Sequence, residues 1–268
     1  MNERSSNTSS PDLTDRAEQR PEKIQAMFDR ISPTYDLLNR LLTLGIDQRW
    51  RTRAIRALGE PNALRGASLL DLCCGTCDMT LRALRLTRGE IGRIDALDFS
   101  ASMLKLAGEK VSQTPWAARV TLRQGDALAL PYQDATFDCA CVAFGIRNVS
   151  DVPRALSEVR RTLRPGGVFV VLEFSTPQSR LVRGIYNLYF RHVLPRAGAL
   201  ISGDGEAYGY LNQSAERFPS GAAFSQVLRR AGFIAVTATP LTFGLVTLYR
   251  AEAPATEHTT ALATDEIR

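Results

Sequence analysis

Residues 69–80 read LLDLCCGTCDMT, an apolar run that ends in an acid and then in a glycine with cysteines on both sides. A short apolar run of this kind predicts a buried strand, and the following residues 78–86 (DMTLRALRL) have the pattern of a helix. Gly75 stands between them, where it allows a tight turn and lets a ligand approach the main chain. The stretch therefore predicts a strand–turn–helix unit with a ligand site at its turn.

The same alternation continues along the chain. Further strands are predicted within residues 92–100, 118–126, 137–145 and 168–175, and helices at 101–111, which Ser100 is expected to cap, and at 151–164, which a PGG sequence is expected to stop. Residues 220–233 predict another helix, and residues 234–240 and 244–252 predict a terminal hairpin. This pattern is typical of an α/β fold: a Rossmann-like, seven-stranded, mostly parallel sheet with helices on both faces and a C-terminal antiparallel hairpin.

The two ends of the chain differ in composition from its middle. Residues 1–20 and 252–268 are polar, and we expect a disordered arm and a disordered tail there. Residues 21–251 form one predicted domain. Within it, residues 21–60 predict an N-terminal helical cap that Pro33 interrupts, and residues 176–215 predict an insertion that faces the substrate or a membrane.

Composition excludes several classes of protein. The 268 residues carry a net charge of +5, but the basic residues are scattered, unlike those of a nucleic-acid surface. No apolar run approaches the ~20 residues of a membrane span, and the polar N-terminal stretch predicts no secretory signal. We therefore expect a cytoplasmic protein with reduced thiols. Cys74 and Cys77 form a C-x-x-C pair, but the five cysteines and two histidines do not supply four zinc ligands at suitable spacing, and the pair lacks the thioredoxin-like setting of a redox site. We therefore interpret the cysteines as small buried residues and expect no metal.

Three acids follow three successive predicted strands: Asp71, Asp98 and Asp126. Each alone is more readily interpreted as a cap or a turn former than as a ligand-binding residue. The carboxyl ends of parallel strands, however, meet at one edge of the sheet. Three acids there, without the second and third glycines of a dinucleotide loop, favour a cationic nucleoside that lacks phosphate, such as S-adenosylmethionine. Asp98 would accept hydrogen bonds from the ribose hydroxyls, and Asp126 would accept one from the exocyclic amine of adenine. Asp71 would lie near the ammonium group of the amino-acid part.

These motifs resemble a known family. DLCCGTCD (71–78) resembles the first motif of class I S-adenosylmethionine-dependent methyltransferases. The more specific segments SPTYDLLNRLLTLGIDQRWR (32–51), AFGIRNV (143–149) and LEFS (172–175) resemble the ubiquinone/menaquinone biosynthesis C-methyltransferases, and the resemblance extends over about residues 24–250. It implies a cofactor site made of Asp71, Gly75, Thr76, Asp98, Asp126, Ala127 and Ala143.

The chain departs from that family at two of these loops. Cys77 stands where the family usually has glycine, and we expect the backbone there to turn without a positive φ. Ala143 stands where some members have serine, which removes one hydrogen-bonding group.

The resemblance implies methyl transfer from S-adenosylmethionine to a ring carbon of a polyprenylated quinol. Demethylmenaquinol is the expected acceptor; the alternatives are the benzoquinol of the ubiquinone route, or another lipid or phenol. Arg147, Asn148 and Tyr35 are the expected catalytic residues. Because Arg147 keeps its charge at neutral pH, it would stabilise a phenolate or orient a water molecule, while Tyr35 would hydrogen-bond the ring oxygen. The alternatives are a surface ion pair for Arg147 and a packed helix residue for Tyr35.

The remaining expectations concern partners and location. Residues 180–201 mix apolar side chains with arginines, a pattern that suits an anionic membrane surface or a buried lid over the substrate pocket. The quinol acceptor would itself reside in a membrane. We therefore expect peripheral association with the inner face of the membrane, a homodimer and no nucleic-acid partner.

Overall fold

The computed structural model describes residues 21–177, 179, 183–184, 188 and 205–255. The predicted arm at 1–20 lies outside these residues, as do most of the predicted tail and most of the segment 180–201. No helix among the described residues combines the length and apolarity that a membrane span requires.

The sheet confirms the predicted fold class. Its seven strands lie in the order β3-β2-β1-β4-β5-β7-β6. They are β1 (Ser68–Leu72), β2 (Arg93–Asp98), β3 (Val120–Gln124), β4 (Phe137–Ala143), β5 (Leu163–Phe174), β6 (Ile234–Leu241) and β7 (Val246–Glu252). The first five pair in parallel, whereas β7 pairs antiparallel with both β5 and β6. The strand order reverses between β1 and β4, which is where ligands bind in open α/β sheets.

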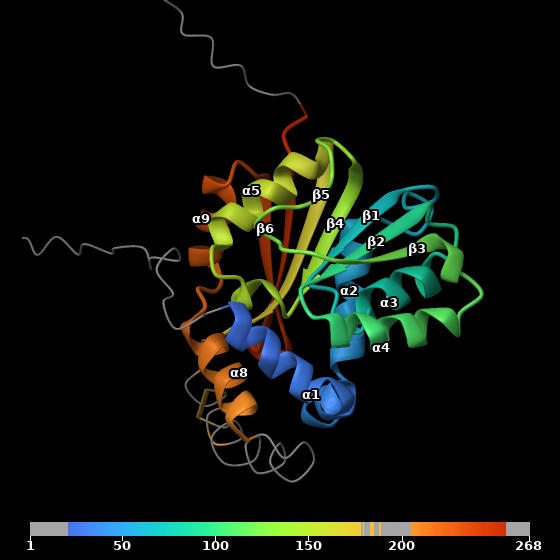
Figure 1. Ribbon diagram of the computed structural model, residues 1–268. Helices are drawn as coiled ribbons and strands as arrows, with labels where there is room; N and C mark the ends of the chain where they lie inside the picture. The colour runs from blue at the N-terminus through green and yellow to red at the C-terminus, as the bar shows by residue number, and fades with distance from the viewer. Residues whose placement is uncertain (1–20, 178, 180–182, 185–187, 189–204, 256–268) are drawn as a thin grey trace, which may run out of the picture.

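Helices cover both faces of the sheet (Figure 1). α2 (Asp47–Leu58), α3 (Asp78–Leu86) and α4 (Ala101–Ser112) pack on one face, and α5 (Val152–Thr162) and α9 (Ala222–Arg230) pack on the other. α1 (Pro21–Leu42) and α8 (Gly205–Arg217) lie next to each other across one end of the sheet. Both faces of the central strands are therefore buried, and every residue of β1 is buried.

The expected interruption at Pro33 is wrong, because α1 runs unbroken from Pro21 to Leu42. A proline inside a helix removes one N–H donor, here the one that would reach the carbonyl of Asp29. The hydroxyl of Ser32 donates to that carbonyl instead, at 3.0 Å. Pro33 itself is exposed, so its ring does not disturb the packing of the helix.

Two other local predictions have different outcomes. Ser100 does cap α4, accepting a hydrogen bond from the N–H of Met103 at 3.1 Å. The PGG sequence at 165–167, expected only to stop a helix, lies inside β5. The pairing of β5 with β4 shifts register between Phe137 and Cys139, so the glycines form an irregular opening to the strand.

Candidate active site

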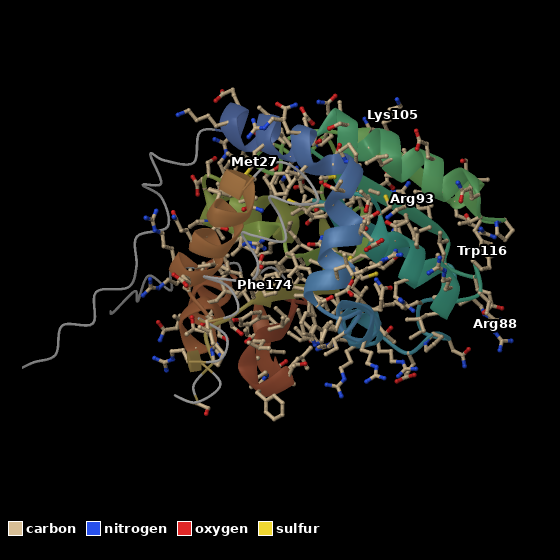
Figure 2. The ribbon with its side chains drawn as sticks, turned by 90° about the horizontal axis from the view of Figure 1, so that it is seen from below. Met27, Arg88, Arg93, Lys105, Trp116 and Phe174 are labelled. Atoms are coloured by element: carbon tan, nitrogen blue, oxygen red, sulfur yellow. The ribbon has the colours of Figure 1, made fainter. Side chains whose placement is uncertain are left out.

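A cleft opens at the carboxyl ends of β1, β2, β3 and β4, and together with the solvent at its mouth it contains about 850 Å³ of empty space. Its walls come from the loops after these strands and from α1, which crosses that end of the sheet. Figure 2 looks onto the molecule from below, with Met27 of α1 and Phe174 at the end of β5 labelled. Of the predicted site residues, the cleft is lined by Tyr35, Gly75, Asp98, Asp126, Ala127, Ala143 and Asn148. The structure therefore brings together residues from five separate segments of the chain.

In the loop after β1, three residues have the left-handed backbone conformation. Cys73, Gly75 and Cys77 have φ values of 51°, 53° and 66°. The expectation that Cys77 turns without a positive φ is therefore wrong. The turn into α3 needs the left-handed conformation whichever residue stands there, at a cost of roughly 1–2 kcal/mol for a side chain with a Cβ. A Cβ added at Gly75 would meet no atom within 4 Å, so this glycine leaves cleft space unfilled.

Asp98 joins two of the loops around the cleft. Its Oδ2 accepts a hydrogen bond from the N–H of Gly75 at 2.7 Å, and its Oδ1 accepts one from the N–H of Ser100 at 2.9 Å. Burial raises the pKa of this carboxyl above its ordinary value, although both main-chain hydrogen bonds oppose the shift. A carboxylate has about four acceptor positions, so Asp98 can accept two further hydroxyl groups from a ligand in the cleft.

Asp126 and Ala127 lie on the opposite side of Asp98 from the glycine loop, after β3. Asp126 is exposed to the cleft, and its Oδ1 accepts a hydrogen bond from the N–H of Leu128 at 2.9 Å. Apolar side chains that the sequence analysis did not select complete this wall, namely Phe28, Phe99 and Met103. Phe99 is 38% exposed, although it is a large apolar side chain. Its position directly after Asp98 was the available signal for a ring-stacking surface.

Asp71 is buried at the end of β1 and does not contribute to the cleft wall. It is 1% exposed, and its Oδ2 accepts hydrogen bonds from the N–H and the hydroxyl of Thr80, at 3.0 and 2.6 Å. The N–H of Thr80 is one of the first in α3, which have no partner within the helix. Asp71 thus fixes α3 to β1. Burial raises its pKa to about 6.

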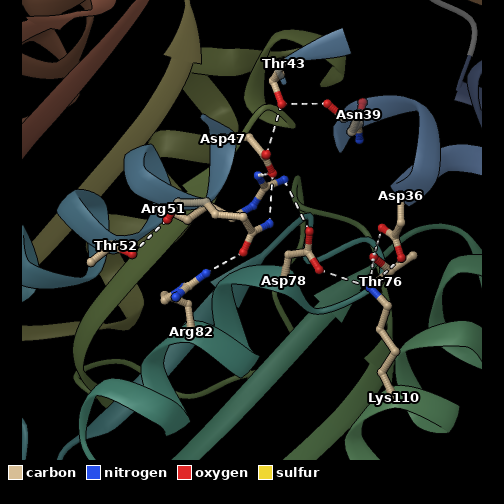
Figure 3. Close-up of polar contacts among 11 residues, drawn as sticks. Asp36, Asn39, Thr43, Asp47, Arg51, Thr52, Thr76, Asp78, Arg82 and Lys110 are labelled. Carbon is tan, nitrogen blue, oxygen red and sulfur yellow. Dashed lines mark hydrogen bonds and ion pairs between the residues drawn. The ribbon is translucent and has the colours of Figure 1, made fainter. Parts of the chain in front are cut away.

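Thr76 belongs to a polar network that fastens α1 to the glycine loop (Figure 3). Its hydroxyl donates to Asp36 at 2.6 Å and accepts from Nζ of Lys110 at 2.8 Å. Lys110 also pairs with Asp36 at 2.5 Å and with Asp78 at 3.0 Å, and Arg51 lies 3.6 Å from Asp78. Four helices, α1 to α4, are therefore connected around the loop that opens the cleft.

The charge on Asp78 depends on this network. Burial by itself would raise the pKa of its carboxyl, but Arg51 and Lys110 outweigh burial, and the pKa lies below its ordinary value. Asp78 consequently stays ionised near the start of α3, where a negative charge is favourable.

The three predicted catalytic residues occupy different depths. Tyr35 and Asn148 line the cleft. Arg147 is only 3% exposed, and its Nη1 forms an ion pair with Oε1 of Glu173 at 2.6 Å. The same Nη1 donates to the carbonyl of Phe144 at 2.5 Å. Burial raises the pKa of Tyr35 above its ordinary value even though Arg147 opposes it, so the phenol keeps its proton at neutral pH.

Glu173, the buried partner of Arg147, is a charged residue that the sequence analysis missed. It was quoted only as part of the LEFS motif. The available signal was an acid within an otherwise apolar strand, a position where a carboxylate requires a buried partner.

The five cysteines are all free thiols. Cys73 lines the cleft, whereas Cys74, Cys77, Cys139 and Cys141 are buried. Burial raises the pKa of the Cys139 thiol to about 12, and it also raises the pKa values of Cys73, Cys74 and Cys141. These four thiols stay protonated at neutral pH, and a protonated thiol is neither a good nucleophile nor a good metal ligand.

Comparison with known proteins places these features in one group. Residues 14–252 match the ubiE/COQ5 methyltransferase family. The ubiquinone/menaquinone biosynthesis C-methyltransferase UbiE of Syntrophotalea carbinolica is 48% identical over 225 residues, which cover 83% of this chain and 91% of that protein. The demethylmenaquinone methyltransferase of Lactiplantibacillus plantarum is 40% identical over 210 residues, which cover 78% of this chain and 87% of that protein.

Solved structures share the fold at low sequence identity. A phosphoethanolamine N-methyltransferase of Haemonchus contortus, in complex with S-adenosylhomocysteine, superposes with a TM-score of 0.63 at 17% identity and covers 86% of this chain and 60% of that chain. A S-adenosylmethionine-dependent methyltransferase of Thermotoga maritima superposes with a TM-score of 0.58 at 19% identity and covers 86% of this chain and 99% of that chain. At this identity the likeness concerns the fold alone.

Proposed function

Because the chain belongs to the ubiE/COQ5 methyltransferase family, we propose that it transfers a methyl group from S-adenosylmethionine to a ring carbon of a polyprenylated naphthoquinol, converting demethylmenaquinol to menaquinol. Relatives named for both the ubiquinone and the menaquinone routes match most of the chain. Two relatives are named demethylmenaquinone methyltransferase, and they support the naphthoquinol acceptor. The benzoquinol of the ubiquinone route is the second candidate.

The residues of the cleft fit the proposed donor. S-adenosylmethionine supplies an electrophilic methyl group on a positively charged sulfur. Asp98 and Asp126 both face the cleft, where two carboxylates favour a cationic nucleoside and disfavour a phosphate. In our proposal Asp98 accepts the ribose hydroxyls, Asp126 and the neighbouring Ala127 hold the adenine edge, and Phe99 contacts its face. The carboxylate of Asp98, joined to the glycine loop at 2.7 Å, is the observation that carries the proposal.

Four more predicted cofactor residues have supporting positions in this proposal. Gly75 leaves the space for the donor, and Ala143 forms part of the wall at the end of β4. Asp71 and Thr76 would affect donor binding by holding the glycine loop in place. Asp71 fixes α3 to β1, and Thr76 joins the loop to α1.

The acceptor ring would lie between α1 and the loop after β4. Aromatic carbon is a weak nucleophile, and removal of a proton from a ring hydroxyl increases its reactivity. Tyr35 keeps its proton and can donate a hydrogen bond to a ring oxygen. Asn148 offers an amide at the same cleft, and Arg147 lies directly behind it in a buried ion pair. Alignment of the ring carbon with the methyl group supplies the rest of the rate enhancement.

A polyprenylated acceptor requires access to a membrane, and one exposed face of the described chain suits that need. Leu37 and Leu41, near the end of α1, and Leu44, in the turn after it, are 55%, 49% and 86% exposed. We propose that this face meets the membrane surface from the cytoplasmic side, peripherally. The predicted basic contact at 180–201 lies mostly outside the described residues, and the homodimer stays a prediction.

Membrane contact has a direct test. Flotation with anionic vesicles at low salt should carry the wild-type protein upward, and a variant with Leu37→Ser, Leu41→Ser and Leu44→Ser should stay at the bottom. Equal flotation of both proteins would remove this face from the proposal.

The decisive experiment for the function uses labelled S-adenosylmethionine with demethylmenaquinol and with the demethylated benzoquinol, followed by mass analysis of the lipid. We expect label on the naphthoquinol. Asp98→Asn should weaken donor binding measured by calorimetry. The matched control is Asp95→Asn on the same strand, whose side chain pairs with Arg93 and is absent from the cleft wall. Transfer to neither quinol by a protein that binds the donor would refute the acceptor class.

A further inference from the structure

Glu173 is a carboxylate in the interior of the molecule. It stands at the end of β5, after Val170, Val171 and Leu172, and all four residues are 0% exposed. Removing a carboxylate from water costs several kcal/mol unless an opposite charge and hydrogen bonds compensate. A buried acid in this position therefore needs a physical explanation beyond packing.

The partners of Glu173 use only one of its oxygens. Oε1 accepts hydrogen bonds from Nη1 of Arg147 at 2.6 Å and from the N–H of Phe174 at 2.9 Å. Oε2 is buried and has no hydrogen-bond partner among the described residues. An ion pair built for stability would engage both oxygens with the guanidinium fork. Here Nη1 donates to both Oε1 of Glu173 and the carbonyl of Phe144, and Oε2 of Glu173 accepts no hydrogen bond among the described residues.

A second unpartnered acceptor belongs to the residue that follows Arg147, the partner of Glu173. Asn148 directly follows Arg147, and its Oδ1 is buried without a hydrogen-bond partner in the described part of the chain. Asn148 also lines the cleft. Buried acceptors in proteins are nearly always satisfied. One such acceptor on the partner of Arg147 and another on the residue after Arg147 indicate a ligand that brings hydrogen-bond donors. A hydroquinone carries two hydroxyl donors, and a bound water molecule carries two as well.

We propose that Glu173 takes up the proton that methyl transfer releases, through a water molecule that joins it to the cleft, while Asn148 accepts from the ring hydroxyl and Arg147 holds the carboxylate in place. This inference rests on the function proposed above. It separates two roles at this site: Arg147 positions a group, and the carboxylate behind it accepts the proton.

The proton balance follows from the reaction. A ring hydroxyl gives its proton to Glu173 while the ring carbon forms its bond to the methyl carbon. The carbon–sulfur bond breaks, and its electron pair stays on sulfur, which becomes a neutral thioether. The ring carbon then loses its hydrogen as a proton, which returns to the ring oxygen and restores the aromatic hydroquinone. One proton remains on Glu173 and leaves to solvent, so neither an oxidant nor a reductant is required.

The charges around Glu173 suit a proton acceptor. Burial raises the pKa of its carboxyl above the ordinary value, and Arg147 opposes that shift. The charge of Glu173 in turn raises the pKa values of two nearby groups, Tyr249 of β7 and Cys73 in the loop after β1. Burial raises the pKa values of both groups, so both are neutral near pH 7, and Thr247, its partner in β7, is uncharged. A carboxylate with a raised pKa is a stronger base than one in water.

The test compares two glutamates that have the same kinds of hydrogen-bond partner but lie in different parts of the molecule. Glu173→Gln keeps the shape of the side chain and removes the proton acceptor. The control is Glu158→Gln, since Glu158 also accepts from an arginine, Arg161 at 2.8 Å, and from a main-chain N–H, but lies away from the cleft. Single-turnover rates of methyl transfer are measured from pH 5 to pH 9, with the donor Kd from calorimetry and Tm recorded for each protein.

We expect Glu173→Gln to lower the single-turnover rate by roughly 10²–10⁴-fold, the usual contribution of a general base. The fall in rate at acid pH seen in the wild type should disappear, while the donor Kd changes less than threefold. Glu173→Asp should retain the acid limb at a reduced rate, and Glu158→Gln should match the wild type in all three measurements. A merely structural role for Glu173 would move Tm and Kd and leave the shape of the pH profile unchanged.

Several outcomes overturn the inference. They are a Glu173→Gln rate within threefold of the wild type, or a slow variant that keeps the wild-type acid limb. If Glu173→Gln does not fold, Glu173→Asp decides, and an acid limb in the same place at the wild-type rate refutes the role. Absence of methyl transfer to either quinol by the wild type refutes the proposed function and this inference together. An active wild type with an equally active Glu173→Gln refutes the inference alone.

Discussion

Gly145 is the position where a single added methyl group should do the most to the cleft. A Cβ built there would lie 2.4 Å from Cβ of Cys73 and 3.3 Å from its Sγ. Ordinary carbon–carbon contacts begin about 1 Å farther apart. The backbone of Gly145, with φ −114° and ψ −33°, accepts alanine without strain. The effect of Gly145→Ala is therefore purely steric, and it falls on the two loops that carry the cleft.

Overpacking of this kind costs about 1–3 kcal/mol, because side chains or backbone must shift. For a chain of this size about 2 kcal/mol lowers Tm by roughly 4–8 °C. Urea denaturation followed by circular dichroism gives the free energy of unfolding, and calorimetry gives the donor Kd. Since Cys73 lines the cleft, we expect Gly145→Ala to weaken donor binding together with stability.

The steric account has a specific rescue. Cys73→Gly removes the clashing Cβ at a residue whose φ of 51° suits glycine, so alone it should be close to neutral. In the Cys73→Gly, Gly145→Ala variant the contact left for the new Cβ is the carbonyl oxygen of residue 73 at 3.5 Å, which is ordinary. The double variant should recover at least about 1 kcal/mol relative to the sum of the single changes. Additivity within about 0.5 kcal/mol would refute the reasoning.

Three further outcomes are expected. Asp98→Asn should raise the donor Kd by about 10–100-fold, since hydrogen bonds to a charged group contribute roughly 1.5–3 kcal/mol, and calorimetry showing an unchanged Kd would contradict this. Ser100→Ala should lower the free energy of unfolding by about 1 kcal/mol or more, because the N–H of Met103 loses its cap and Asp29 loses a donor; Ser100→Thr, whose hydroxyl can make both bonds, should restore stability. Asp71 has a pKa of about 6 in the folded chain and an ordinary value of 3.8, so the folded state holds the proton more tightly. Its contribution to stability is therefore greatest below pH 3.8 and declines as pH rises to 6, by about 3 kcal/mol in total. Asp71→Asn should remove that part of the pH dependence. The measurement is the free energy of unfolding of both proteins by urea denaturation at several values between pH 4 and pH 7. If the free energy of unfolding changes equally with pH in the two proteins, the prediction is contradicted.

The periodic elements were predictable because their signals are local. The helix at 78–86 was predicted with the bounds that α3 has, and the cap at Ser100 needs only the main chain three residues away. The hairpin of β6 and β7 followed from two short strands separated by a turn. The failure at Pro33 is equally instructive, because one hydroxyl on the preceding residue supplied the donor that proline lacks.

Residue roles at the site were harder to predict than its location. Asp71 and Asp98 both end a strand of the same sheet, yet one fixes a helix and the other faces the cleft. Arg147 and Glu173 lie 26 residues apart and pair in the interior. Sequence spacing predicts neither the different roles of the two aspartates nor the pairing of Arg147 with Glu173. Both depend on which side chains from distant segments reach the same buried volume.

The sequence by itself determined the parallel sheet, the edge at which a ligand binds and the acids that meet there, because strand alternation and the right-handed crossover fix those relations locally. Only the tertiary structure decided which carboxylates face the cleft, which are tied to helices, and which one lies buried with a free oxygen against an arginine. Burial and pairing are set by long-range packing, and they change the free energy of a charge by more than any local preference does.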